Sequence, residues 1–350
     1  MNFPNQSAIP ELIRVKPGVL DLIGIYLKRA RFDRVVVLVS EGLPLSIVDR
    51  FKASLEQEEV EILQMKAVGS SEFGESLRTF RELPDAGLAV VGLGGARALD
   101  VAKYVAFLAR KPFFSVPTSI SCNRFCSPHS TLVIERKNRM LSSAMPLGLV
   151  IDTDVCLAAP QELWLAGVGD LMANLTALVD WKLAYYEFGI LMDDYAEMQA
   201  EAAVNQFVAD PHFTRSGTRL LASSLIMSGI GMMVCGSARP SSGSEHLISH
   251  ALDSVSKKPM EHGLQVGVAT YIVSRLQGGE SELIAAVFTK SGFWSAFSQQ
   301  RFRLDEWLEA VRVASSPRPE EFSVLSSRDC VPEVEAMIRE DPLLQGCFFH

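Results

Sequence analysis

The run from residue 87 to residue 109, GLAVVGLGGARALDVAKYVAFLA, decides the fold. Its first five residues are apolar, as in a buried strand, and apolar residues at helical spacing follow from Arg97 to Ala109. Between the two stand three glycines: Gly92, Gly94 and Gly95. Glycine permits close approach of the backbone, and free N–H groups at the start of a helix attract a phosphate. The run therefore predicts a strand, a turn and a helix, with the turn as a candidate phosphate site.

The turn alone does not identify a ligand. A Rossmann fingerprint has a third glycine at the position of Arg97, and an acidic residue roughly 20 positions later that binds the ribose. Here the acid that follows a strand, Glu41, comes earlier in the chain. A tight strand-to-helix turn without a ligand therefore stays the alternative.

The same cycle of strand and helix repeats on both sides of this run. Apolar and β-branched runs predict strands at Arg34–Ser40, Val60–Met65, Phe113–Val116 and Leu147–Ile151. Helical spacing predicts helices at Leu20–Arg29, Pro44–Leu55 and Glu72–Leu83. Continuous apolar strands alternating with helices are typical of a parallel sheet buried on both faces. We expect a Rossmann-like α/β domain over residues 1–155.

From about Pro160 the pattern changes to helices alone. Apolar residues recur at three- and four-residue spacing over Glu162–Tyr186, Met192–Val208 and Arg219–Cys235. A length of 350 residues fits about two domains. We expect an all-helical second domain over residues 156–350.

Composition excludes several classes of partner. The chain has 33 Lys and Arg against 41 Asp and Glu, a net charge of −8, so it lacks the basic excess that nucleic acid binding requires. Its six cysteines form no C-x-x-C pair, which suits reduced thiols in the cytoplasm. The N-terminus has no apolar signal region, and we interpret the apolar stretch Leu220–Cys235 as a buried helix too short to span a membrane. We expect a cytoplasmic protein that binds neither nucleic acid nor membrane.

Three of the six histidines cluster in the second domain. His246 and His250 stand four residues apart, on one face of a helix, and His262 follows after the helix-breaking Pro259. A helix, a turn and a second helix can return these imidazoles to one place. Three histidines within 17 positions favour a metal site over separate structural histidines.

A carboxylate that could complete such a site is Asp170. It interrupts the apolar, small-residue stretch Leu165–Thr176, and a buried carboxylate needs a partner. One carboxylate with two imidazoles and an open position is the pattern of a catalytic Zn²⁺ or Fe²⁺ site that polarises a substrate oxygen. The alternative is that Asp170 is the N-cap of a helix that begins after Gly167 and Gly169.

Six motifs resemble, in this order, the sn-glycerol-1-phosphate dehydrogenases. These enzymes belong to a superfamily with glycerol dehydrogenases, iron-containing alcohol dehydrogenases and dehydroquinate synthase. The resemblance extends from about residue 15 to about residue 275 and implies the dehydroquinate synthase-like fold. The motifs are VVGLGGARALDVAK, SVPTSISCNRFCSP, LVIDTDV, LAGVGDLMANLTALVDWKLA, SGSEHLISHALD and EHGLQVGVAT.

The resemblance implies roles for single residues. The family's metal ligands match Asp170, His246 and His262, and its active-site histidine for proton relay or substrate contact matches His250. The nicotinamide dinucleotide would lie on the first domain, whereas metal and substrate would bind the second. A carboxylate at Glu41 would accept hydrogen bonds from the ribose of NAD and repel the 2′-phosphate of NADP, which favours NAD. The family's cofactor-binding residues match Glu41, Gly92, Gly94, Gly95, Asp100, Lys103, Thr118 and Ser121.

The chain also departs from the family pattern. Ala96 replaces a third consecutive glycine, and Asn123 and Arg124 stand where the family reads D-G in its S-x-D-G substrate loop. The second change removes a substrate-side carboxylate and adds a guanidinium. We expect Asn123 and Arg124 in the catalytic site, where Arg124 would favour a doubly charged phosphate, phosphonate or carboxylate. The alternative is that Arg124 points to solvent.

Together these features predict a metal-dependent, NAD(P)-linked oxidoreductase. It would interconvert a small ketone such as dihydroxyacetone phosphate and its secondary alcohol, with Zn²⁺ expected and Fe²⁺ the alternative metal. We expect a small anionic polyol or ketone as substrate and a homo-oligomer as the assembly. Two other hypotheses stay open: a sugar-phosphate cyclase of the dehydroquinate synthase kind, and a non-catalytic nucleotide-binding homologue.

Overall fold

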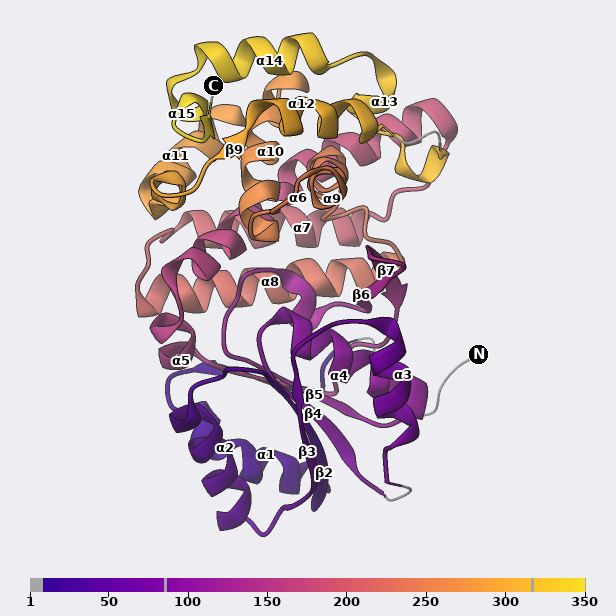
Figure 1. Cartoon of the computed structure of the whole chain (residues 1–350), viewed down its shortest axis with the longest axis vertical. Helices are drawn as coiled ribbons and strands as arrows, with labels where there is room; N and C mark the ends of the chain where they lie inside the picture. Colours follow the sequence, from indigo (N-terminus) through magenta and orange to yellow (C-terminus); the bar gives the residue numbers. More distant parts are fainter. Residues whose placement is uncertain (1–8, 85–86, 316–317, 350) are drawn as a thin grey trace. The chain divides into compact units, whose positions relative to one another are not determined.

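The fold is taken from a computed structural model that describes residues 9–84, 87–315 and 318–349. The chain forms two compact units, Met1–Pro160 and Gln161–His350. The predicted boundary between residues 155 and 156 lies a few residues before this division. Figure 1 shows both units, coloured along the sequence.

The first unit contains a six-stranded parallel sheet in the order β1-β8-β5-β4-β2-β3. Its central strands are continuous apolar runs, as in RVVVLVS of β2, so the predicted parallel α/β architecture is confirmed. The strands are β1 (Leu12–Lys16), β2 (Arg34–Ser40), β3 (Glu61–Val68), β4 (Ala89–Gly94), β5 (Phe113–Pro117) and β8 (Gly148–Asp152).

Both faces of this sheet are buried against helices (Figure 1). Side chains of a strand alternate between the faces, and Val35 and Val37 of β2 pack with the α1 and α2 side while Val36 and Leu38 pack with the α3 and α4 side. The helices of this unit are α1 (Ile23–Arg29), α2 (Leu45–Gln57), α3 (Phe73–Arg81), α4 (Ala96–Ala109) and α5 (Thr153–Ala158), with the short 3₁₀ helices η1 (Val19–Leu22) and η2 (Asn123–Cys126).

Three strands of this unit are absent from the predicted set. Strand β1, LIRVK, carries charges within an apolar run, and it pairs only with β8 at the edge of the sheet. Strands β6 (His129–Ile134) and β7 (Lys137–Ser142) form a separate antiparallel hairpin, and β7 is mostly exposed and polar. None of the three has the long apolar pattern on which the strand predictions depend.

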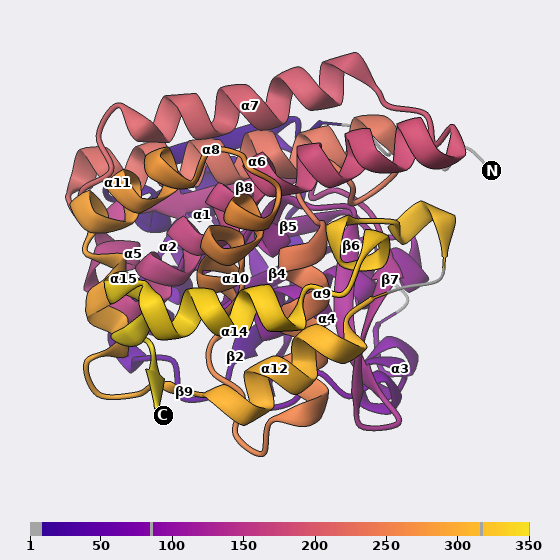
Figure 2. The same cartoon turned by 90° about the horizontal axis from the view of Figure 1, so that it is seen from above.

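The second unit is helical, with one small exception. Strands β9 (Phe302–Arg303) and β10 (Phe348–Phe349) form a two-stranded parallel pair, so the expectation of helices alone is wrong at these four residues. Figure 2 shows α7 lying along α8. The helices are α6 (Gln161–Phe188), α7 (Asp194–Val208), α8 (Arg215–Cys235), α9 (Ser244–Val255), α10 (His262–Leu276), α11 (Ser281–Ser291), α12 (Leu304–Val313), α13 (Val324–Ser327), α14 (Val331–Glu340) and α15 (Pro342–Gln345), with η3 (Phe293–Phe297) and η4 (Pro319–Glu321).

Two of these helices, α6 and α8, are long and apolar enough to cross a membrane by length and composition. Their most apolar windows are 78% and 56% buried within the fold, as in core helices of a folded domain. Helix α8 has 21 residues, so the prediction that this stretch is too short for a span is wrong, whereas the prediction of a helix is confirmed.

Helices α6 and α10 pack closely because glycines lie where they cross. A Cβ atom at Gly169 of α6 would lie 2.1 Å from the carbonyl oxygen of Gly263, and one at Gly263 would lie 2.1 Å from the carbonyl oxygen of Ala166. Gly169 precedes Asp170, and Gly263 follows His262. The close contact of the two backbones therefore brings the carboxylate of one helix to the imidazole of the other.

Candidate active site

Asp170, His246 and His262 lie together in the second unit, with one potential ligand atom of each within 4.8 Å of the others. The Nε2 atoms of His246 and His262 are 3.6 and 3.9 Å from the same Asp170 oxygen, Oδ1. Asp170 lies in the middle of α6, so the alternative that it is a helix N-cap is wrong. His246 is in the first turn of α9, and His262 begins α10.

The spacing of these atoms suits one divalent cation. Bonds of about 2.1 Å in tetrahedral geometry place ligand atoms about 3.4 Å apart, and the two distances to Asp170 lie just above this value. The side chains are 4–15% exposed, so little water competes for the position between them. Carboxylate oxygen and imidazole nitrogen are both ligands of Zn²⁺ and Fe²⁺.

A buried carboxylate orients His246. Nδ1 of His246 donates to Oε1 of Glu245 over 2.9 Å, which leaves Nε2 as the nitrogen directed to Asp170. Glu245 is fully buried and also accepts from the backbone N–H of Gly243 and the hydroxyl of Thr176. Metal-ligating histidines commonly donate their other ring N–H to a carboxylate in this way.

A hydroxyl and an amide orient His262. The Ser249 hydroxyl donates its proton to Oε1 of Gln265 over 2.7 Å, so it accepts from Nδ1 of His262, 2.9 Å away. Gln265 is in turn held by the carbonyl of Met260. Both imidazoles are thus held with Nδ1 protonated and Nε2 available to a cation. Sequence patterns did not predict these supporting residues, although Glu245 and Ser249 are near neighbours of the predicted ligand His246.

The surroundings of His246 favour its protonated form. Burial lowers its pKa, but hydrogen bonds to Asp170 and Glu245 more than offset this effect and raise the pKa to about 9. The two carboxylates that favour a proton on His246 would also favour a metal ion at its ring, and the ion must displace that proton to bind.

His250 lies beside the three potential ligands. Its ring centroid is 5.8 Å from that of His262, with nearly parallel planes, and 6.4 Å from that of His246. Helical spacing of four residues on α9 produces this position, as predicted. His250 therefore lies next to the cluster with its side chain exposed.

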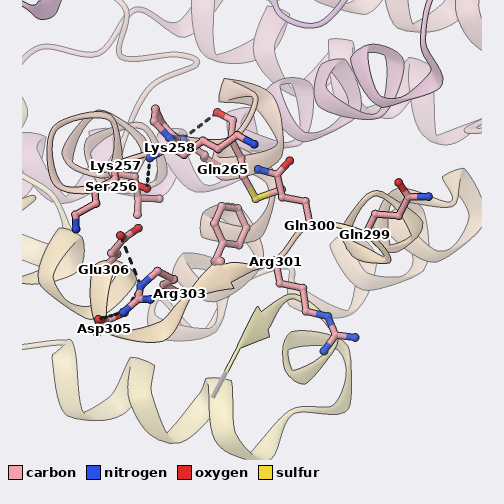
Figure 3. A pocket seen from close by; sticks show the side chains of 14 residues that line it. Ser256, Lys257, Lys258, Gln265, Gln299, Gln300, Arg301, Arg303, Asp305 and Glu306 are labelled. Carbon is pink, nitrogen blue, oxygen red and sulfur yellow. Dashed lines mark hydrogen bonds and ion pairs between the residues drawn. The ribbon is translucent and has the colours of Figure 1, made fainter.

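Gln265 also forms part of the wall of an open hollow of about 720 Å³ in the second unit. Figure 3 shows its lining, in which both acidic residues, Asp305 and Glu306, pair with Arg303. The side chains of Lys257 and Arg301 point away from each other, so these cations do not converge on one anion.

The glycine turn of the first unit lies where β4 meets α4. Gly94 has φ of +143°, and a Cβ there would lie 2.1 Å from the Ser40 hydroxyl, so only glycine fits. The N–H of Gly95 donates to that hydroxyl, and Gly95, the N-cap of α4, provides no side-chain cap. Gly92 has a different role, because a Cβ there would press on Ala102 of α4. The first turn of α4 thus offers backbone N–H groups to an anion.

Other predicted cofactor residues surround this turn. Glu41 follows β2, the neighbour of β4 in the sheet, and is exposed. Thr118 follows β5, on the other side of β4, and its N–H donates to the carbonyl of Gly94. Ser121 comes three residues later and is buried. The structure therefore places Glu41 and Thr118 at the carboxyl edge of the sheet, where ligands of parallel α/β sheets bind, and Ser121 in the loop that follows.

Asp100, Lys103 and Arg124 form a buried ion cluster. Asp100 lies 3.5 Å from both Lys103 and Arg124, and the side chains of Asp100 and Lys103 have no exposed surface. Burial raises the pKa of Asp100 and lowers that of Lys103. Nζ of Lys103 donates to the carbonyls of Arg124 and Ser127. Asp100 and Lys103 therefore hold the loop around η2. The side chain of Arg124 is 26% exposed and directed to Asp100, so it does not simply point to solvent, and its contact with substrate stays a prediction. Asn123 begins η2 beside it.

Comparison with known proteins identifies relatives along nearly the whole chain. The profile of the iron-containing alcohol dehydrogenases matches residues 14–160. The glycerol-1-phosphate dehydrogenase [NAD(P)+] of Aeropyrum pernix is 34% identical over 343 residues, covering 95% of this chain and 96% of the relative. The enzyme of the same name from Methanothermobacter thermautotrophicus is 31% identical, covering 94% and 96%.

Solved structures show the same fold at lower identity. A probable glycerol dehydrogenase from Sinorhizobium meliloti matches with a TM-score of 0.73 and 19% identity, covering 95% of this chain and 98% of that chain. An iron-containing alcohol dehydrogenase from Thermotoga maritima matches with a TM-score of 0.65 and 16% identity, covering 91% and 96%. The chain belongs to the glycerol-1-phosphate dehydrogenase family, within the superfamily of the iron-containing alcohol dehydrogenases.

Proposed function

We propose that this protein is a metal-dependent, NAD(P)-linked oxidoreductase that interconverts dihydroxyacetone phosphate and sn-glycerol-1-phosphate. The observation that carries the proposal is the convergence of Asp170, His246 and His262, with His250 beside them. Relatives named glycerol-1-phosphate dehydrogenase align with nearly the whole chain, which supports the same substrate class.

Asp170, His246 and His262 would hold the cation, with Zn²⁺ proposed over Fe²⁺. When bound, a divalent cation supplies a Lewis acid that polarises the substrate's carbonyl or hydroxyl oxygen. Glu245 and Ser249 keep both imidazoles in the tautomer that presents Nε2. His250 moves the proton to or from that oxygen, since an ordinary imidazole titrates near neutral pH.

The first unit would bind the nicotinamide dinucleotide, which supplies or accepts the hydride. The N-terminus of α4, after Gly94 and Gly95, receives the pyrophosphate, and Glu41 accepts from the ribose hydroxyls. Thr118 and Ser121 would also contact the dinucleotide in this unit. Asn123 lies in the substrate loop, and Asp100 with Lys103 fixes that loop. The assembly is a homo-oligomer in the cytoplasm.

The test is turnover with zinc-loaded protein, dihydroxyacetone phosphate and NADH or NADPH, followed at the nicotinamide absorbance. We expect steady oxidation of the coenzyme, and we expect His262→Ala to lose zinc and turnover together. His212→Ala is the matched control, because His212 is exposed and pairs with Asp210, which is not part of this site. Phosphate release without net coenzyme oxidation would indicate a cyclase instead. Binding of zinc and coenzyme without turnover of any small ketone or polyol phosphate would indicate a non-catalytic homologue.

A further inference from the structure

The oppositely charged side chains of Glu41 and Arg97 both lie at Gly69, near the glycine turn. Gly69 directly follows β3, and a Cβ at this position would lie 2.1 Å from Oε2 of Glu41, so the carboxylate lies against the glycine backbone. From the first turn of α4, Nη1 of Arg97 donates to the carbonyl of the same Gly69 over 3.0 Å. Both side chains are exposed. The ends of β2 and β3 and the start of α4 thus share one small area.

This area is where a dinucleotide's adenosine ribose belongs. In parallel α/β folds the pyrophosphate binds at the helix that follows the glycine turn, and an acid at the end of the neighbouring strand binds the ribose 2′-hydroxyl. Strand β2, which ends before Glu41, is the hydrogen-bonded neighbour of β4. A 2′-phosphate on that ribose would therefore come close to Glu41, and an arginine nearby is what accommodates such a phosphate.

We propose that Arg97 is the residue that recognises the 2′-phosphate when NADP is the coenzyme, beside the Glu41 carboxylate at the ribose. The proposal rests on the proposed function and refines its coenzyme. Within the described ranges Glu41 and Arg97 form no direct ion pair with each other, so the guanidinium is not held on this carboxylate. Arg97 uses one N–H on Gly69 and keeps the others for a phosphate.

The absence of a side chain at Gly69 is part of the arrangement. Any larger residue would displace the Glu41 carboxylate from its present position. The sequence expectation that Glu41 disfavours NADP considered this carboxylate alone. It did not include the guanidinium of Arg97, which reaches Gly69, 28 residues earlier in the chain.

The experiment measures dissociation constants of NADH and NADPH by fluorescence titration of the full-length protein. We expect comparable binding of both by the natural protein. Arg97→Gln should weaken NADPH by about 10- to 100-fold, the effect of losing a charge-assisted contact, and change NADH by less than about threefold. Glu41→Gln should shift the ratio in the opposite direction. Arg29→Gln is the matched control, because Arg29 is exposed at the end of α1, before β2 begins and so at the opposite edge of the sheet.

The outcomes separate this inference from the function on which it rests. If the natural protein binds neither coenzyme, both are overturned. If it binds NADH but not NADPH, or if folded Arg97→Gln protein keeps the natural ratio of the two constants, the role of Arg97 is overturned and the oxidoreductase proposal stands. Circular dichroism confirms that each variant is folded.

Discussion

Replacing Glu245 by glutamine would remove one negative charge behind the potential metal ligands while keeping the shape of the side chain. Oε1 would still accept from Nδ1 of His246 and from the N–H of Gly243. The new amide group would face the hydroxyl of Thr176, which can instead donate to the carbonyl of Ala173, 3.1 Å away. The groups that now bond to Glu245 would keep hydrogen-bond partners, so the main change is the loss of the charge.

The expected effect is on metal affinity. The negative charge makes His246 a better donor, and loss of such a supporting carboxylate typically weakens a metal site by about 10- to 100-fold, or about 1.4–2.7 kcal/mol. The assay is competition for Zn²⁺ against a chromophoric chelator at pH 7.5, with unfolding followed separately by calorimetry. Glu282→Gln, on an exposed position of α11, is the matched control and should bind zinc as the natural protein does.

The result that refutes this reasoning is specific. If Glu245→Gln protein is folded and binds zinc as tightly as the natural protein, then the carboxylate behind His246 does not support a metal site.

Three further predictions concern pH, packing and thiols. The pKa of His246 is raised to about 9, so below that pH a proton competes with zinc for this imidazole. Apparent zinc affinity should therefore rise about tenfold per pH unit from pH 7 to 9 and then level off. An affinity that does not change with pH would contradict this. Gly169→Ala should destabilise the fold by about 1–3 kcal/mol in urea unfolding, since its Cβ would meet the backbone of Gly263, and unchanged stability would show that α6 and α10 can separate freely. Burial raises the pKa of Cys126 and of Cys347 to about 12, so iodoacetamide at pH 8 should leave both unmodified in the folded protein and label them after denaturation, as mass spectrometry would detect.

The sequence predicted the parts of the fold that have a strong repeating pattern. Strand β2 begins and ends at the predicted residues, because a short β-branched run bounded by polar residues is typical of a buried strand. The long helices α6 and α8 were predicted because their apolar residues recur at three- and four-residue spacing. Strand β1 was not predicted, because an edge strand needs only one partner and tolerates the charges of Arg14 and Lys16.

In the candidate site, too, the sequence predicted some features and not others. Asp170 on α6, His246 on α9 and His262 on α10 come together, with glycines where α6 and α10 cross. Their roles as ligands stay predictions. The direction of a polar side chain depends on partners far away in the sequence. Arg124 is directed to Asp100, from another helix, and the contact of Arg97 with Gly69 depends on the end of β3. No local pattern contains these contacts.

The most direct test is a crystal structure of zinc-loaded protein with anomalous data collected at the zinc edge. The account predicts one anomalous peak within about 2.0–2.2 Å of an Asp170 oxygen and of Nε2 of both His246 and His262. A protein that takes up no zinc, or a peak that lies away from these three atoms, would contradict it.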